Sequence, residues 1–158
     1  MSKKFLIITI LLLIVIMLIA YFVVVNNNGN NSDKGNQNTN PTGTEIQGMK
    51  VETLRQGSGQ GAKVGDYLTT NYVGTLQDGK EFDSSIKRNV QYTFQLGKDR
   101  VIKGWDLGLL GMKVGETRKL TIPPELAYGL DGFPPTIPQN ATLTYVIDLL
   151  RITPDSSK

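Results

Sequence analysis

The 158-residue sequence contains no histidine and no cysteine. Without histidine, the chain has no imidazole general base and no Ser-His-Asp relay. Without cysteine, it has no disulfide, no thiolate nucleophile, no iron–sulfur cluster and no cysteine-containing zinc site. The missing cysteines do not indicate a redox compartment, because a chain without them suits either side of a membrane. Any catalysis must therefore use carboxylates, hydroxyls, backbone amides, cationic side chains, or shape and desolvation.

An excess of charge of one sign is also lacking. The chain has 17 lysines and arginines against 14 aspartates and glutamates, and residues 45–158 hold fourteen of these cations and thirteen of these acids. The part after the first 44 residues is therefore close to neutral, whereas domains that bind nucleic acid usually carry a basic patch or stripe. We expect no nucleic-acid partner.

One apolar run near the start takes a large share of a modest hydrophobic content of 39%. Phe5–Val25 is a run of 21 residues interrupted only by Thr9 and the amphipathic Tyr21. At about 1.5 Å per helical residue, this run spans roughly 31 Å, the thickness of the hydrocarbon core of a bilayer. We therefore predict that residues 1–25 are an N-terminal signal-anchor whose transmembrane helix covers residues 5–25.

The residues around this run bear on its orientation and its fate. Lys3 and Lys4 precede it, and an asparagine-rich stretch follows it. By the positive-inside rule, the N-terminus is cytoplasmic and the rest of the chain extracytoplasmic, as in a single-pass protein of the cell membrane. The alternative is a cleaved signal peptide and a secreted protein. Against cleavage, the apolar part of a signal peptide is usually shorter, and only Ala20 is small near the end of this run.

Residues 26–45 differ in composition from the segments on both sides. Residues 26–44 contain eight asparagines, three glycines and no aliphatic or aromatic residue. Such a segment buries too little apolar surface to offset the entropy lost on ordering it. We predict an asparagine-rich disordered linker over residues 26–45. Asn30 and Asn140 begin matches to the N-glycosylation pattern, and the sequence leaves open whether either is used.

Residues 46–154 have the pattern of one folded domain, and residues 155–158 that of a polar C-terminal tail. Only Lys103–Met112 has a helical pattern, in which Trp105, Leu109 and Met112 form one stripe. Many strands around one short helix predict an α+β domain built on an antiparallel sheet. The expected strands are short alternating apolar stretches between glycine-containing turns, at Met49–Leu54, Tyr67–Leu76, Lys80–Ser84, Val90–Leu96, Thr117–Ile122 and Thr142–Ile152.

Six strings of this domain coincide, in order, with the motifs of a known family. They are DGKEFDSS from Asp78, VIKGW from Val101, GMKVGE from Gly111, LTIP from Leu120, AYG from Ala127, and IP from Ile137 followed by ATL from Ala141. Together they resemble the FKBP-type peptidyl-prolyl cis-trans isomerases over residues 49–152. The resemblance implies a five- or six-stranded antiparallel sheet wrapped around one short helix, with an apolar pocket between them. It also implies that Leu130–Asn140 is a flap too short to hold a further domain.

The reaction of this family suits a chain without histidine or cysteine. Rotation about a peptide bond faces a barrier of about 18–20 kcal/mol, and it breaks no bond, so it needs no nucleophile, metal or cofactor. A pocket lowers this barrier by desolvation and hydrogen bonding if it binds the twisted imide better than the planar one. The resemblance thus implies a monomeric rotamase that assists the folding of proline-containing clients, here exported or surface proteins. It also implies binding of the family's macrolide inhibitors.

A second function remains open on the same fold. The domain can instead be a catalytically weak, proline-binding chaperone or a docking module, which retains the pocket but isomerises proline bonds slowly. The intact set of motif residues favours the enzyme.

The resemblance assigns roles to individual residues. Asp83, Tyr72 and Tyr128 are the catalytic candidates, and the Tyr128 hydroxyl is expected to bind a ligand carbonyl. Trp105 is expected to be the pocket floor that receives the proline ring, and Ile137 to supply an apolar contact and a backbone donor. Without the motifs, the apolar members of this set would be ordinary core residues. The substrate-binding candidates are Phe82, Tyr92, Phe94, Val101, Ile102, Trp105, Phe133, Ile137 and Tyr145.

Asp83 has two interpretations from sequence. In one, its carboxylate lies at the pocket edge and orients Tyr72 or polarises the site. In the other, it is a structural ion pair with Arg88, five residues further along the chain.

Some residues depart from the family pattern. Tyr92 and Tyr145 stand where members commonly have phenylalanine, so we expect two extra hydroxyls at the pocket base, each in need of a hydrogen-bond partner. Phe133 and Thr136 replace more usual flap residues. These departures leave peptide preference and macrolide affinity open.

Overall fold

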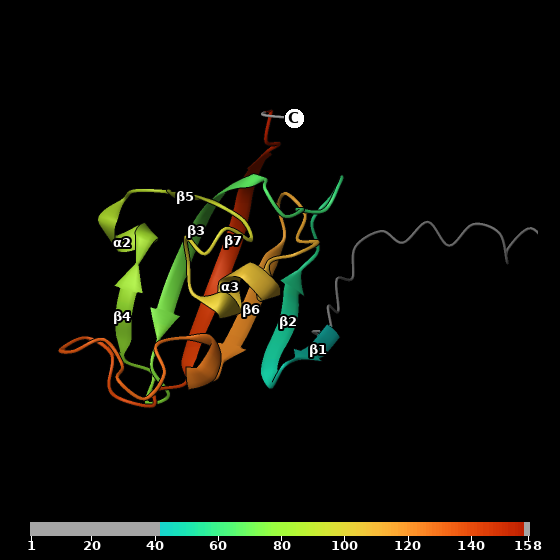
Figure 1. Ribbon diagram of the computed structural model, residues 1–158. Coiled ribbons are helices and arrows are strands. Elements are labelled where there is room, and N and C mark those ends of the chain that lie inside the picture. Colours follow the sequence, from blue (N-terminus) through green and yellow to red (C-terminus); the bar gives the residue numbers. More distant parts are fainter. Residues whose placement is uncertain (1–41, 157–158) are drawn as a thin grey trace, which may run out of the picture. The chain divides into compact units, whose positions relative to one another are not determined.

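The computed structural model describes residues 42–156, drawn in colour in Figure 1. The predicted anchor and most of the predicted linker lie outside these residues. Within residues 42–156, no helix is long and apolar enough to cross a membrane. The elements in chain order are β1 (Thr42–Ile46), β2 (Met49–Arg55), β3 (Tyr67–Thr75), β4 (Glu81–Ser84), α2 (Ser85–Arg88), β5 (Tyr92–Gln95), α3 (Lys103–Gly108), β6 (Thr117–Ile122), the 3-10 turn η1 (Pro124–Leu126) and β7 (Leu143–Thr153).

These strands form one antiparallel sheet, as the sequence predicts. The order is β1-β2-β6-β7-β3-β4, and β5 also pairs with β3. The short helix α3 crosses one face of the sheet and packs against β2 and β6 (Figure 1). The described part of the chain has seven strands, not the five or six expected, because β1 adds an edge strand and the other edge is divided into β4 and β5.

The divided edge corrects the strand predicted over residues 90–96. A one-turn helix, α2, separates β4 from β5 and delays the start of β5. The Ser84 hydroxyl accepts a hydrogen bond from the Lys87 amide at 3.2 Å, and Asn89 ends the turn in a left-handed conformation. Strand pairing resumes only at Tyr92. Val90 is therefore 62% exposed and does not share the buried face with Phe94.

The other edge corrects the boundary of the predicted linker. Residues 42–45 belong to β1, which pairs with β2 from Thr42–Thr53 to Ile46–Met49. Gln47 and Gly48 connect the two strands, and both have positive φ angles, as a tight hairpin turn with the twist of the strands requires. Backbone hydrogen bonds stabilise this strand, and side-chain composition does not reveal them.

Helix α3 is positioned by two glycines. A Cβ on Gly104 would lie 2.5 Å from Ile122 Cγ2, and one on Gly108 would lie 2.8 Å from Leu120 Cδ1, so the helix backbone rests directly on β6. The helix ends at Gly108, earlier than predicted. The predicted stripe is nevertheless buried, with Trp105 3% exposed.

The inward face of β7 supplies the opposite side of the core. Leu143, Tyr145, Ile147 and Leu149 alternate along the strand and are all buried, as predicted from their period of two. Tyr145 is the polar member of this row, and it places a hydroxyl beside the indole of α3.

Candidate active site

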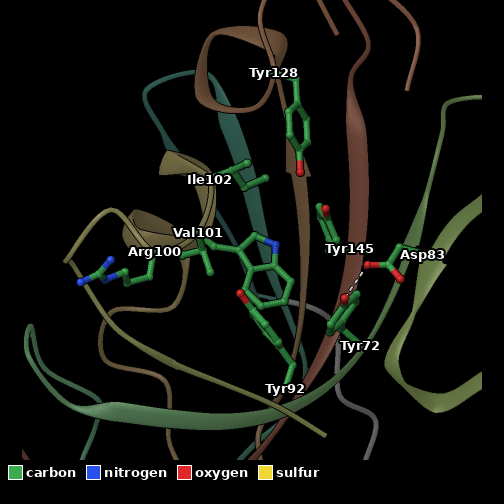
Figure 2. Close-up of a pocket in the computed structure, with 9 residues that line it drawn as sticks. Tyr72, Asp83, Tyr92, Arg100, Val101, Ile102, Tyr128 and Tyr145 are labelled. Atoms are coloured by element: carbon green, nitrogen blue, oxygen red, sulfur yellow. Dashed lines mark hydrogen bonds between the residues drawn. The ribbon is translucent and has the colours of Figure 1, made fainter. Parts of the chain in front are cut away.

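A cavity of about 310 Å³ opens between α3, the adjoining strands and the loop after η1. Figure 2 shows Ile102, Tyr128 and Tyr145 directed toward a common space, whereas the Arg100 guanidinium extends away from it. Eight of the predicted site residues line the cavity, together with one that was not predicted. The lining residues are Tyr72, Asp83, Tyr92, Arg100, Val101, Ile102, Trp105, Tyr128 and Tyr145.

The floor of the cavity is a cluster of aromatic rings around Trp105. The indole lies edge-to-face with Tyr72 and Tyr145, at centroid distances of 5.2 and 5.1 Å, and with Phe94 at 5.5 Å. Such contacts fix ring orientation beyond the gain from area alone. Because Gly104 and Gly108 press α3 onto β6, the indole has one packed position. Its ring lines the cavity as a flat apolar surface.

One wall consists of a hydrogen-bonded trio from β3, β4 and α2. The Tyr72 hydroxyl donates to Asp83 Oδ2 at 2.5 Å (Figure 2) and accepts from Arg88 Nη2 at 2.9 Å. Arg88 Nη1 also donates to Asp83 Oδ1. The Tyr72 backbone amide is held in turn by the Ser85 hydroxyl at 2.8 Å. Asp83 thus makes both of the contacts considered from the sequence, one with the Tyr72 hydroxyl and one with Arg88.

Tyr128 covers the cavity from the loop after η1. In Figure 2 its hydroxyl points into the cavity, toward Tyr145. Burial, with a smaller contribution from Tyr92, raises the pKa of Tyr128 above that of a free tyrosine. The hydroxyl therefore stays protonated, and no hydrogen bond within residues 42–156 uses its proton. It is available as a donor to a ligand.

Two of the predicted binding residues lie behind the cavity lining. Phe82 packs edge-to-face on Tyr145 at 5.5 Å. Phe94 is 5% exposed and stacks on Tyr92 at 5.6 Å, beneath the floor. Both support the lining residues and do not themselves face the cavity.

The flap also differs from the prediction. Phe133 is 59% exposed and contacts the Tyr128 ring at 5.8 Å, outside the cavity lining. Ile137 is buried, and its amide donates to the Phe133 carbonyl at 2.8 Å. The amide predicted to bind a peptide is therefore already engaged within the flap.

Arg100 is the lining residue that sequence reasoning missed. It lies across the cavity from Asp83 (Figure 2), and it has no carboxylate partner within the described residues. The VIKGW motif begins at the next residue, Val101, so the motif itself did not mark it. Its position directly before this motif is the sequence feature that could have indicated that it lines the cavity.

The extra hydroxyls expected at the pocket base are present. Tyr92 and Tyr145 both line the cavity, and neither hydroxyl makes a hydrogen bond within residues 42–156. The Trp105 indole nitrogen is buried and also lacks a hydrogen-bond partner there. Burial keeps the pKa of Tyr145 far above its ordinary value. The floor is apolar in shape, but it holds donors that the described part of the protein does not use.

A twisted antiparallel sheet packed on one short helix, with an aromatic cavity floored by the helix tryptophan, defines a domain of the prolyl isomerase class. The family described as FKBP-type peptidyl-prolyl cis-trans isomerase matches residues 59–150. The chain belongs to this family, and it is an enzyme, a peptidyl-prolyl cis-trans isomerase.

Individual relatives agree with this assignment. FK506-binding protein 1 of Rhizopus delemar is 49% identical over 106 residues, covering 66% of this chain and 98% of that protein. Human peptidyl-prolyl cis-trans isomerase FKBP2 is 55% identical over 91 residues, covering 58% of this chain and 64% of that protein. A crystal structure of FkpA from Escherichia coli is 42% identical with a TM-score of 0.67, covering 75% of this chain and 54% of that one.

Proposed function

We propose that the cavity rotates Xaa-Pro bonds by removing water from the imide while holding the flanking carbonyl. The planar imide is stabilised by resonance that separates charge, and water solvates that charge. A twisted imide is less charge-separated, so a dry aromatic floor favours it over the planar form. Each ~1.36 kcal/mol of such preference gives a tenfold gain in rate. The observation that carries this proposal is the packed indole of Trp105 at the base of the cavity.

The wall residues have separate roles in this proposal. Tyr128 donates a hydrogen bond to a ligand carbonyl, which positions the peptide over the floor. Tyr72 cannot donate its proton to the ligand while it binds Asp83. The trio of Tyr72, Asp83 and Arg88 is therefore a fixed wall that orients one face of the proline ring, and it transfers no proton.

The proposed clients are proline-containing segments of exported or surface proteins. The support is the 21-residue apolar run Phe5–Val25 behind two lysines, which has the length and flanking charge of a membrane anchor. With a linker of about 20 residues, a flexible coil would give the domain a reach of roughly 25 Å from the membrane. Sequencing of the mature N-terminus tests the anchor: a chain that begins near Asn26 has been cleaved and is secreted.

The rate of cis-to-trans rotation in a Leu-Pro peptide tests the activity. The full chain in detergent should accelerate the reaction. FK506, which the Rhizopus relative is named for binding, should abolish that acceleration by filling the same cavity. A rate equal to the uncatalysed one, with retained peptide binding, would favour the proline-binding chaperone or docking module.

A further inference from the structure

Tyr145 occupies an unusual place for a polar side chain. It lies on the central strand β7, is 6% exposed, and packs its ring against Trp105 at 5.1 Å and Phe82 at 5.5 Å. Its hydroxyl lines the cavity and makes no hydrogen bond within residues 42–156. This hydroxyl opens onto the cavity and takes no part in the hydrogen bonding of the fold, so the fold alone gives no reason for it.

The neighbouring groups do not supply the missing acceptor. Tyr72 approaches the Tyr145 ring at 6.0 Å, but its hydroxyl is already bound to Asp83 and Arg88. The indole nitrogen of Trp105 is itself a buried donor without a partner among the described residues. Neither neighbour therefore offers the Tyr145 hydroxyl a free acceptor.

The Tyr145 hydroxyl is directed at the ligand space. Figure 2 shows it facing the Tyr128 hydroxyl across the cavity. Burial, with smaller contributions from Tyr128, Tyr72 and Tyr92, raises its pKa, so it carries its proton at any physiological pH. An oxygen atom of a ligand that lies between Tyr128 and Tyr145 would satisfy an otherwise unsatisfied donor.

We propose that Tyr145 is a specificity-determining residue, whose hydroxyl donates a hydrogen bond to an oxygen atom of the prolyl ligand bound in the cavity. This inference rests on the proposed function of the cavity, because it takes the ligand to be a prolyl peptide. The ligand class it selects carries a carbonyl oxygen next to the pyrrolidine ring. A phenylalanine at this position, as is common in the family, would lack this hydrogen bond.

We predict that Tyr145→Phe lowers the affinity for ligand without lowering the melting temperature of the free protein. The change removes one oxygen and keeps the ring that packs on Trp105. Without ligand, the change removes a hydroxyl that makes no hydrogen bond within residues 42–156, so the melting temperature should stay equal or rise. With ligand, a hydrogen bond is lost, so affinity should fall about two- to tenfold. A purely structural hydroxyl would lower stability and leave affinity unchanged.

Binding of N-acetyl-Ala-Leu-Pro-Phe-amide to the full chain in detergent tests this directly. Trp105 is the one tryptophan of the chain, so its fluorescence reports occupancy of the cavity, and circular dichroism gives the melting temperature. The matched control is Tyr67→Phe, at a 43% exposed tyrosine outside the cavity lining, which should match the wild type in both measurements.

An affinity of Tyr145→Phe within a factor of 1.5 of the wild type, or a loss of affinity together with a lower melting temperature, would overturn the proposal. Wild-type isomerisation of the same peptide is measured in parallel. A wild type that binds without catalysing contradicts the proposed function alone, because the comparison of affinities still decides the role of Tyr145.

Discussion

Asp83 shows how one carboxylate organises a wall of the cavity. It binds the Tyr72 hydroxyl and the Arg88 guanidinium together, and Arg88 also donates to Tyr72. All three side chains therefore depend on a single charge. The side chains of Asp83 and Arg88 are partly exposed, so solvent weakens their electrostatic attraction.

Asp83→Asn should lower kcat/KM about fivefold, because Tyr72 loses its charged acceptor and Arg88 its partner. The matched control is Glu81→Gln, which breaks the ion pair with Lys87 outside the cavity and should leave kcat/KM unchanged. Steady-state kinetics with the Leu-Pro peptide measures both variants. Equal activity of Asp83→Asn and the wild type would show that the trio has no part in the reaction.

Tyr145 also predicts how stability depends on pH. Its pKa is raised by burial in the folded state, whereas a tyrosine in the unfolded chain ionises near about 10. Above that pH the unfolded chain releases a proton that the folded chain retains, so the free energy of unfolding falls as the pH rises.

Urea unfolding between pH 8 and 11 should therefore show a steeper loss of stability in the wild type than in Tyr145→Phe. The difference in slope should approach about 1.4 kcal/mol per pH unit above pH 10. Parallel curves for the two proteins would contradict the burial of a protonated hydroxyl.

At the scale of elements, the contact of α3 with β6 sets the position of Trp105. Gly104→Ala should destabilise the protein by about 1–3 kcal/mol, because the new methyl group would overlap buried Ile122. It should also reduce kcat/KM by tilting the indole. In the control Gly43→Ala, the new methyl group meets only Lys50 Cε and Glu52 Cγ, at ordinary contact distances of 3.8 and 3.9 Å. Urea unfolding gives both stabilities, and a Gly104→Ala protein as stable as the wild type would refute the close contact.

The secondary-structure elements differ in how far the sequence could predict them. Strands β6 and β7 follow from apolar alternation, and Pro123 ends the former because proline cannot continue the ladder. The one-turn helix α2 depends on the Ser84 cap and the left-handed Asn89, and strand β1 depends on backbone pairing with β2. Neither α2 nor β1 therefore has a periodic apolar pattern in the sequence by which it could be predicted.

The site was predictable where a motif carried it. Trp105 and Tyr128 lie within motif strings and line the cavity. Arg100 lies outside a motif and is exposed, so nothing in its residue type distinguished it from other surface cations. The Ile137 amide was assigned from family resemblance, but its partner, the Phe133 carbonyl, depends on the conformation of this flap.

At the scale of the whole molecule, all nine of the described residues that line the cavity lie on the folded domain. Removing residues 1–41 should therefore leave kcat/KM for a free Leu-Pro peptide within twofold of the full chain. If the proposed anchor is correct, the truncated chain should also move from the membrane fraction to the supernatant. A truncated chain that still sediments with membranes would show that residues 1–41 are not what holds the protein there.

We propose above that the aromatic cavity floored by Trp105 accelerates Xaa-Pro rotation. Isomerisation of a Leu-Pro peptide by the wild type and by Trp105→Ala tests it most directly, with Leu110→Ala, an exposed residue just after α3, as the control. We predict acceleration by the wild type and the control, and a loss of about tenfold or more in kcat/KM for Trp105→Ala in a protein that stays folded. Unchanged turnover in Trp105→Ala would contradict the account.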